Sequence, residues 1–393
     1  MSKRFNRVHN ATDEKFINAA NTIFENAFPG QNLFIILKPP ANPPLRYVEL
    51  RYNTKIIIRN KRIKYSLSEL LKTHDIIILH GLNAITASLV NKETIPKIVY
   101  LPWGAEISLN HENYQNQLYG NKTLILKKRL RRKLNIGKLK SLYHLIKNFG
   151  TKGTSNKVLP SIFGIRFIGI SFIEEFEKQK NSKVFHSDSH FIPFTYYPLE
   201  SIIKDFEKSH VTGNNILVGN SSSYTNNHLE TFDLLKGIEL EQRKIIVPLG
   251  YGSKIYSRSL IRTGKRLFKN NFMPIETFKS LKEYTEILCS CNIVLMNHLR
   301  QEAYGTILSV MWLGAKVFLN ESNTIFLYLK RIGCHVYALN KISHSNHNDL
   351  LVPLSDLQIQ ENRNIIQKEI SLSVIVNKLK HGMNVLFPNL PKN

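Results

Sequence analysis

The sequence predicts an α/β protein of two domains, each a parallel sheet covered by helices. Short apolar runs of strand type alternate with stretches of helical periodicity along most of the 393 residues, and strands joined through helices are normally parallel. A stretch with two prolines at 191–198 ends the first series, and a second series starts at residue 216. We therefore expect a first domain over 1–200, a second over 201–375, and a C-terminal tail over 376–393.

The first domain is predicted from one clear helix and a set of strands. Apolar residues at helical spacing predict a helix over 13–28, which Pro29-Gly30 ends. Polar or aromatic segments directly follow two of the strands, and ligands of parallel sheets bind beyond the carboxyl ends of strands. The predicted strands cover 4–9, 32–37, 55–59, 75–80, 98–101 and 164–171, and the segments that follow two of them contain His80, Gly81, Asn83, Trp103 and Gly104.

Glu106 is the first candidate for a catalytic group. It lies just past the strand at 98–101, beside an aromatic residue and a glycine, where a carboxylate can serve as a general base. The alternative is a solvated glutamate at a helix N-terminus, stabilised by the helix dipole. Asp13 also follows a strand of the first domain and is the second candidate.

The charge of the chain points to an anionic partner. It has 54 basic and 29 acidic residues, a net charge of +25, which suits nucleic acid, an anionic membrane or a phosphate-bearing substrate. Residues 122–147 hold ten cations and no acid, interleaved with leucine and isoleucine. This pattern favours a membrane surface, with a helix packed on a core as the alternative. RNA binding is weaker because no aromatic stacking platform accompanies the charges. The expected lipid contacts are Lys127, Lys128, Arg129, Arg131, Arg132 and Lys133.

Several classes of protein are disfavoured by what the sequence lacks. Three cysteines are too few for a disulfide framework. No signal peptide and no apolar run of membrane-spanning length is seen, which predicts a soluble or peripheral protein. His186, Asp188 and His190 alternate like metal ligands, but no further ligand set accompanies them. We expect no metal and no cofactor.

The second domain carries three loops that directly follow predicted strands. They cover 219–228, 248–252 and 300–306, and the last leads into a predicted helix at 304–314. Glycine lets a backbone approach a ligand closely, and a helix N-terminus offers unpaired N–H groups to an anion. Three such loops would meet at one edge of the sheet, which indicates a pyrophosphate site. The alternative for each loop is an ordinary turn.

These residues resemble glycosyltransferase family 56. The likeness lies in ILVGNSSSYTNNH at 216–228, IIVPLGYG at 245–252 and LRQEAYGTILSVMWLGAKVFLN at 299–320, with weaker similarity in LHGLN at 79–83 and PWGAEI at 102–107. The resemblance implies a GT-B fold, in which two Rossmann-like domains face a central cleft and the C-terminal one holds the nucleotide sugar.

The resemblance also implies an activity and a place in the cell. It implies transfer of a 4-acetamido-4,6-dideoxyhexose from a TDP-sugar to a saccharide on undecaprenyl pyrophosphate, in enterobacterial common antigen or O-antigen type polysaccharide synthesis. The enzyme would be peripheral, at the cytoplasmic face of the bacterial inner membrane.

The resemblance assigns roles to the residues above. The segments around His80 and Trp103 would bind the acceptor, and Glu106 or Asp13 would be the base. A nucleotide-binding or RNA-binding protein, or a membrane-surface scaffold with a GT-B-like fold, is the non-catalytic alternative. We expect no nucleic-acid partner. The donor-binding residues would be Gly219, Asn220, Ser221, Ser222, Asn226, His228, Pro248, Gly250, Tyr251, Arg300, Gln301, Gly305 and Thr306.

Overall fold

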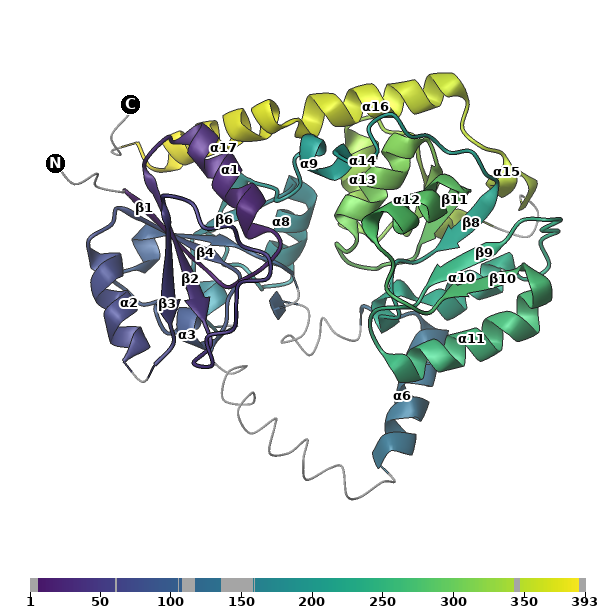
Figure 1. Ribbon diagram of the computed structural model, residues 1–393, viewed down its shortest axis with the longest axis horizontal. Coiled ribbons are helices and arrows are strands. Elements are labelled where there is room, and N and C mark those ends of the chain that lie inside the picture. Colours follow the sequence, from purple (N-terminus) through teal and green to yellow (C-terminus); the bar gives the residue numbers. More distant parts are fainter. Residues whose placement is uncertain are drawn as a thin grey trace. The chain divides into compact units, whose positions relative to one another are not determined.

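The chain folds into two compact units, which we describe separately (Figure 1). The computed structural model describes residues 6–60, 62–104, 106–107, 117–135, 158, 160–342 and 347–388. Unit 1 comprises Met1–Tyr114, Leu145–Ser201 and Glu369–Asn393, and unit 2 comprises Gln115–His144 and Ile202–Lys368. Helix α9 (Leu199–Ile203) contains one of the points of division.

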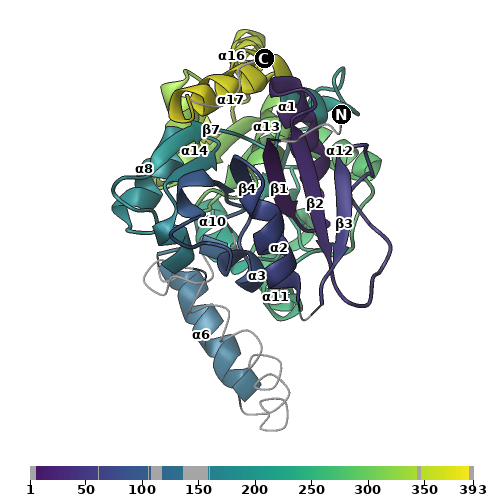
Figure 2. The ribbon, with the colours of Figure 1, turned by 90° about the vertical axis from the view of Figure 1, so that its left-hand side faces the viewer.

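Unit 1 is built on a seven-stranded sheet in which every pairing is parallel. The strand order is β3-β2-β1-β4-β5-β6-β7, and Figure 2 shows β3 as an edge strand beside β2 and β1. Residues on both sides of β1, β4 and β5 are buried, as expected where helices cover both faces of a sheet. The strands are β1 (Arg7–Ala11), β2 (Asn32–Lys38), β3 (Thr54–Ile58), β4 (Ile76–His80), β5 (Ile98–Leu101), β6 (Phe167–Ile170) and β7 (His190–Pro193).

The helices of unit 1 bury apolar faces against this sheet. In α1, Ile17, Ala20, Ile23, Phe24 and Ala27 are buried at the predicted helical spacing. Because the segment from 369 onward belongs to this unit, the end of the chain is part of its structure. The helices are α1 (Ile17–Ala27), α2 (Ile63–Lys72), α3 (Ala84–Ala87), the 3₁₀ turn η1 (Ile95–Lys97), α8 (Ile173–Asn181) and α17 (Leu372–Leu386).

Unit 2 has a second parallel sheet of six strands in the order β10-β9-β8-β11-β12-β13. Its core includes Ile216, Val218, Ile245, Val247 and Ile293, and these residues come from the runs that predicted strands. The strands are β8 (Asn215–Val218), β9 (Ile245–Pro248), β10 (Phe272–Ile275), β11 (Cys291–Met296), β12 (Lys316–Leu319) and β13 (Val336–Ala338).

The helices of unit 2 connect these strands. The predicted helix at 304–314 is α13, which ends at Gly314 with φ +103°, the left-handed conformation that suits glycine at a helix end. The helices are α6 (Asn121–Asn135), η2 (Tyr224–Asn226), α10 (His228–Leu235), α11 (Lys254–Phe268), η3 (Lys269–Asn271), α12 (Leu281–Cys289), α13 (Tyr304–Leu313), α14 (Thr324–Arg331), η4 (Leu339–Lys341), α15 (His347–Leu351) and α16 (Asp356–Ile370).

Two parts of the expected domain division are wrong. The basic segment was expected in the first domain, but its described part forms α6 in unit 2, where Leu126 packs against the core. The Thr123 backbone N–H donates to Glu230 Oε1 at 2.9 Å, which fixes the start of α6 to α10. Residues 376–393 were expected as a tail, but α17 packs on α1 and β7 of unit 1. Residues 136–147 of the basic segment lie outside the described residues.

Candidate active site

The strand order of each sheet marks the place where a ligand site is expected. In unit 2 the chain builds outward from β8 through β9 to β10, and then in the opposite direction from β11 through β12 to β13. The two connections that follow such a central pair of strands run over opposite faces of the sheet. A crevice therefore opens between them at the carboxyl ends of the pair. In unit 2 the loops at this switch point are 219–227 and 297–303. In unit 1 the switch point lies between β1 and β4.

The loop after β8 is folded around the side chain of Asn226. The Asn220 backbone N–H donates to Asn226 Oδ1 at 2.8 Å, and Asn226 Nδ2 donates to Ser221 Oγ at 3.2 Å. Gly219 has φ +68°, and a Cβ at this position would lie 2.6 Å from Asn226 Oδ1 and 2.7 Å from His228 Nε2. The turn at the end of β8 therefore requires glycine.

The loop after β9 is joined to the loop after β8 by backbone hydrogen bonds. The Ser222 N–H donates to the Tyr251 carbonyl at 2.7 Å, and the Ser253 N–H donates to the Ser222 carbonyl at 3.1 Å. The Ser222 hydroxyl donates to the same Tyr251 carbonyl at 2.7 Å, and Ser222 is buried. Ser222 thus holds the two loops together, while the Tyr251 side chain is 78% exposed and accessible for stacking. Pro248 ends β9 and Gly250 lies in this loop.

The loop after β11 places Arg300 beside an acidic partner that the sequence analysis overlooked. Arg300 Nε and Nη2 lie 3.0 Å and 2.9 Å from Glu302 Oε2. His298 is wholly buried, and its Nε2 lies 3.9 Å from Glu302 Oε1. Burial tends to raise the pKa of Glu302, but His298, Arg300 and a hydrogen bond from Thr225 outweigh it and lower that pKa below its ordinary value. Arg300 is therefore already paired with a carboxylate.

Helix α13 begins directly after this loop. Ala303, at its N-cap, has φ +61°. Gly305 and Thr306 lie in the first turn of the helix, and both residues are half-exposed. The first N–H groups of a helix have no carbonyl partner within the helix, and the helix dipole is positive at this end. The start of α13 and Arg300 thus lie in one short segment at the carboxyl end of β11, with Gln301 between Arg300 and Glu302.

Two buried histidines lie beneath the switch point of unit 2. Burial lowers the pKa of His228 to about 3 and also lowers the pKa of His298, so both rings are neutral at neutral pH. His228 Nε2, both ring nitrogens of His298 and Asn220 Oδ1 are buried with no hydrogen-bond partner among the described residues. Such atoms are rare in native proteins and concentrate where a ligand or water completes the structure.

The switch point of unit 1 contains a chain of hydrogen-bonded aromatic side chains. His9 Nδ1 lies 3.0 Å from His80 Nε2, and His80 Nδ1 lies 2.9 Å from the Tyr196 hydroxyl. Burial lowers the pKa of His80 to about 3, so this histidine is neutral. Gly81 has φ +69°, and the Trp103 ring packs so closely on it that a Cβ would lie 2.8 Å from the ring. The structure thus brings His80, Gly81 and Trp103 together at the carboxyl end of β4, with Gly104 next in the chain at φ +85°.

Glu106 is held close to the same place. Its Oε1 accepts hydrogen bonds from the Tyr100 hydroxyl at 2.8 Å and from the Trp103 backbone N–H at 2.9 Å. Burial and the nearby Glu106 raise the pKa of Tyr100 well above its ordinary value, so the phenol stays protonated and donates a hydrogen bond to the carboxylate. Glu106 is thus oriented and half-buried beside Trp103.

Asp13 and Asn83 have structural tasks in unit 1. Asp13 accepts backbone hydrogen bonds from Arg46 at 2.6 Å, Tyr47 at 3.0 Å and Val48 at 2.9 Å. Burial tends to raise the pKa of Asp13, but these bonds lower it below its ordinary value, which speaks against the expected reserve base. Asn83 Oδ1 caps α3 by accepting from the backbone N–H groups of residues 85 and 86.

Glu14 is a carboxylate at this edge that the sequence analysis did not single out. It follows β1 at the switch point, and burial and the neighbouring Asp13 raise its pKa. A raised pKa is typical of acids and bases that exchange protons near neutral pH. The position of Glu14 beside Asp13 is visible in the sequence, but its raised pKa depends on the fold.

The structure bears on possible metal-binding groups and on the expected membrane contacts. Among the described residues, no group of three histidines, cysteines or carboxylates is placed to hold a metal ion. In the same part of the chain, no helix combines the length and the apolarity needed to cross a bilayer. Lys127 was expected to contact lipid, but its ammonium lies 3.7 Å from the centre of the Tyr119 ring within unit 2. Lys128, Arg129, Arg131 and Arg132 are exposed, and the side chain of Lys133 is outside the described part.

One family model matches a segment of the chain. Residues 158–351 match the family model described as 4-alpha-L-fucosyltransferase, glycosyl transferase group 56. No curated protein matches the sequence. The expected resemblance to family 56 is thus confirmed over a segment that contains all three loops of the unit 2 site.

Solved structures share the fold. Anabaena HepE in complex with UDP-glucose has a TM-score of 0.59 at 9% identity, over 96% of this chain and 99% of that one. Sucrose-phosphate synthase from Thermosynechococcus elongatus has a TM-score of 0.57 at 9% identity, over 98% and 100%. A glycosyltransferase from Rickettsia africae has a TM-score of 0.56 at 13% identity, over 98% and 100%. The chain therefore has the GT-B fold, and the match of its residues 158–351 to family 56 supports a glycosyltransferase activity.

Proposed function

We propose that the protein transfers a 4-acetamido-4,6-dideoxyhexose from a TDP-sugar to a saccharide on undecaprenyl pyrophosphate, at the cytoplasmic face of the bacterial inner membrane. The product would enter a cell-surface polysaccharide of the enterobacterial common antigen or O-antigen type. The observation that carries the proposal is the meeting of three loops of unit 2 at one sheet edge, after β8, β9 and β11. The nucleotide-sugar class is supported by HepE, which was solved with UDP-glucose.

The diphosphate of the donor fits the segments that flank the switch point. The start of α13 and the guanidinium of Arg300 both favour an anion. Arg300 would exchange its bond to Glu302 for one to a phosphate oxygen, so that it faces an anion in both states. The exposed ring of Tyr251 would stack on the nucleoside.

The proposed transfer uses no metal ion. The acceptor hydroxyl oxygen forms a bond to the anomeric carbon, the bond from that carbon to the β-phosphate oxygen breaks, and TDP leaves with the electron pair. Arg300 and the backbone N–H groups stabilise the charge that develops on the diphosphate. In an inverting reaction, Glu106 takes the proton of the acceptor hydroxyl.

Calorimetry with TDP, UDP and GDP in the presence of EDTA tests the donor site. We expect TDP to bind most tightly, and Arg300→Ala to weaken it by about tenfold to a hundredfold, because a hydrogen bond to a charged group contributes about 1.5–3 kcal/mol. Arg258→Gln on α11 removes one exposed cation of the same unit and serves as the control, with little change expected. Tight binding of RNA without binding of any nucleotide would overturn the proposal in favour of a non-catalytic protein.

The acceptor side needs a separate assay. Glu106→Gln should abolish transfer to an undecaprenyl-pyrophosphate-linked saccharide, followed by mass spectrometry of the lipid, while leaving the affinity for TDP unchanged. Glu14→Gln is the matched comparison, since it alters a second carboxylate at the same sheet edge. Loss of transfer with Glu14→Gln alone would assign the base to Glu14 instead.

A further inference from the structure

We propose that α6 and α11 together form an anionic-phospholipid docking surface on unit 2. The inference rests on the proposed function in that a lipid-linked acceptor requires the enzyme to reach a membrane. The sequence analysis considered only the basic segment that contains α6. Helix α11 was not part of that expectation, and the structure places it beside α6.

Helix α11 carries a continuous stripe of cations opposite its buried face. Its basic residues recur every three or four positions, which places them on one side of a helix. The other side, including Tyr256, Leu260 and Phe268, packs into the core of unit 2. Neither α11 nor α6 contains an acidic residue. The exposed cations of α11 and of the residue after it are Lys254, Arg258, Arg262, Lys265, Arg266 and Lys269.

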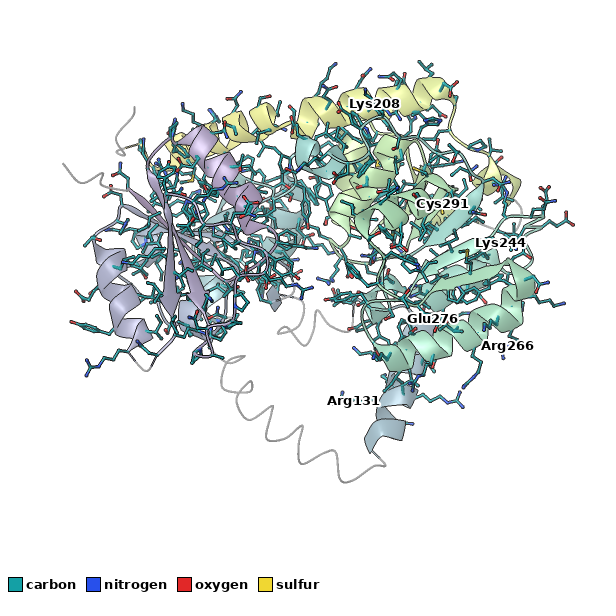
Figure 3. All side chains as sticks on the ribbon, viewed as in Figure 1. Arg131, Lys208, Lys244, Arg266, Glu276 and Cys291 are labelled. Atoms are coloured by element: carbon teal, nitrogen blue, oxygen red, sulfur yellow. The ribbon has the colours of Figure 1, made fainter. Side chains whose placement is uncertain are left out.

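Helix α6 is attached firmly enough to present its cations together with those of α11. The Gly120 N–H donates to Asn227 Oδ1 at 2.9 Å, and the Lys122 ammonium pairs with Asp233 at 2.8 Å. The Tyr224 ring stacks on Tyr256 of α11 with centroids 4.3 Å apart. Figure 3 shows Arg131 on α6 and Arg266 on α11 at the lower side of unit 2.

The composition of this surface favours a bilayer over a nucleic acid. Ile125 is 67% exposed on α6, between Lys122 and the pair Lys128 and Arg129 on the same side of the helix. A large apolar side chain within a cationic face is typical of helices that lie in the headgroup region of a membrane. No exposed aromatic residue lies on either helix for bases to stack on.

Vesicle co-sedimentation of the full chain tests the proposal. We expect binding to phosphatidylcholine vesicles that contain about one third phosphatidylglycerol, and little binding to phosphatidylcholine alone, with the difference lost at high salt. Replacing three cations of α11 should weaken binding by roughly a hundredfold, since each basic residue near the surface contributes about a factor of five. The α11 variant combines Arg258→Gln, Arg262→Gln and Arg266→Gln, and its α6 counterpart combines Lys128→Gln, Arg129→Gln and Arg132→Gln.

A matched control removes three cations elsewhere on unit 2. Lys204, Lys208 and Lys282 are exposed, and Figure 3 shows Lys208 at the upper side of the unit, away from α11. Changing these three to glutamine should leave vesicle binding within about twofold of the unaltered protein. Equal losses in the control and the α11 variant would show that net charge alone drives binding, and would overturn the proposal.

Two further readouts separate this inference from the proposed function. Calorimetry with TDP on the α11 variant should give the affinity of the unaltered protein, which also shows that the variant is folded. If vesicles bind but no nucleotide does, the proposed function fails and the docking surface stands. If TDP binds but the α11 variant still sediments with the vesicles, the docking surface fails. Binding of an RNA oligonucleotide in place of vesicles, lost in the α11 variant, would assign the surface to nucleic acid.

Discussion

Replacing Gly219 by alanine tests the packing at the end of β8. Gly219 adopts φ +68°, and an added Cβ would lie 2.6 Å from Asn226 Oδ1 and 2.7 Å from His228 Nε2. Asn226 shapes the phosphate loop by accepting the N–H of Asn220. The substitution therefore adds backbone strain and crowds the side chain that organises the site.

The magnitude follows from three terms, and Gly237 supplies a control. A left-handed conformation costs a non-glycine residue about 1–2 kcal/mol, crowding in a packed region costs about 1–3 kcal/mol, and the stiffer unfolded chain returns about 0.4–1 kcal/mol. We expect a net loss of about 1–4.5 kcal/mol in the free energy of unfolding. Gly237 has φ +87° with no heavy atom within 4 Å of an added Cβ, so Gly237→Ala carries only the backbone terms and should lose at most about 1.5 kcal/mol.

Urea unfolding followed by circular dichroism measures both variants, with the transition of unit 2 as the readout. Calorimetry with TDP then asks whether the loop still binds. Gly219→Ala should lose more stability than Gly237→Ala by about 1–3 kcal/mol and bind TDP more weakly. If the two variants lose the same stability and both bind TDP normally, the close packing of Gly219 against His228 is refuted.

Three shorter predictions concern other residues of the two units. Asn227→Ala removes side-chain hydrogen bonds to the carbonyls of Leu118, Thr225 and Asn297 and should destabilise unit 2 by about 2–4 kcal/mol and expose α6 to protease, measured by limited proteolysis. Asp13→Asn should lower the melting temperature of unit 1 and leave the kcat of transfer unchanged, because Asp13 holds backbone N–H groups. His228, with its pKa lowered by burial to about 3, destabilises the fold as the pH falls below about 6.5, where the unfolded imidazole takes up a proton. Of the stability lost by pH 5 in acid unfolding, about 2 kcal/mol should come from His228 and be absent in His228→Asn.

The fold was predictable because its strands and helices repeat simple patterns. Apolar runs such as 293–296 and 316–319 formed β11 and β12, and the glycine at 314 ended α13 as expected. The less apolar strands were not predicted. β10 contains Pro274 and an exposed Met273, and it lies at the edge of its sheet, where a missing N–H is tolerated.

The partner of a charged side chain was harder to predict than its position. Arg300 was correctly placed at the end of a strand, but its pairing with Glu302 depends on a sharp turn that brings residues two apart into contact. The basic segment was recognised by composition, whereas its attachment to unit 2 depends on Asn227 and Glu230, more than a hundred residues away in the chain. Contacts between residues so far apart in the sequence leave no local pattern from which they could be predicted.

The Arg300 and Glu302 pair has a consequence for how donor binding depends on pH. A diphosphate bound beside Arg300 brings negative charge close to Glu302 and His298 and so raises the pKa of both groups. His298 starts from a pKa that burial lowers, although Glu302 raises it and Arg300 lowers it. Binding should therefore be coupled to proton uptake, and affinity should rise as the pH falls below about 6.5, the ordinary pKa of histidine, below which the pKa of His298 lies in the unliganded protein. TDP-glucose is the suitable probe, since its diphosphate has no proton to exchange in this range.

Calorimetry in two buffers of different ionisation enthalpy measures the protons taken up, and His298→Asn should reduce that number. An affinity for TDP-glucose that does not change with pH would mean that the diphosphate binds elsewhere than beside Arg300.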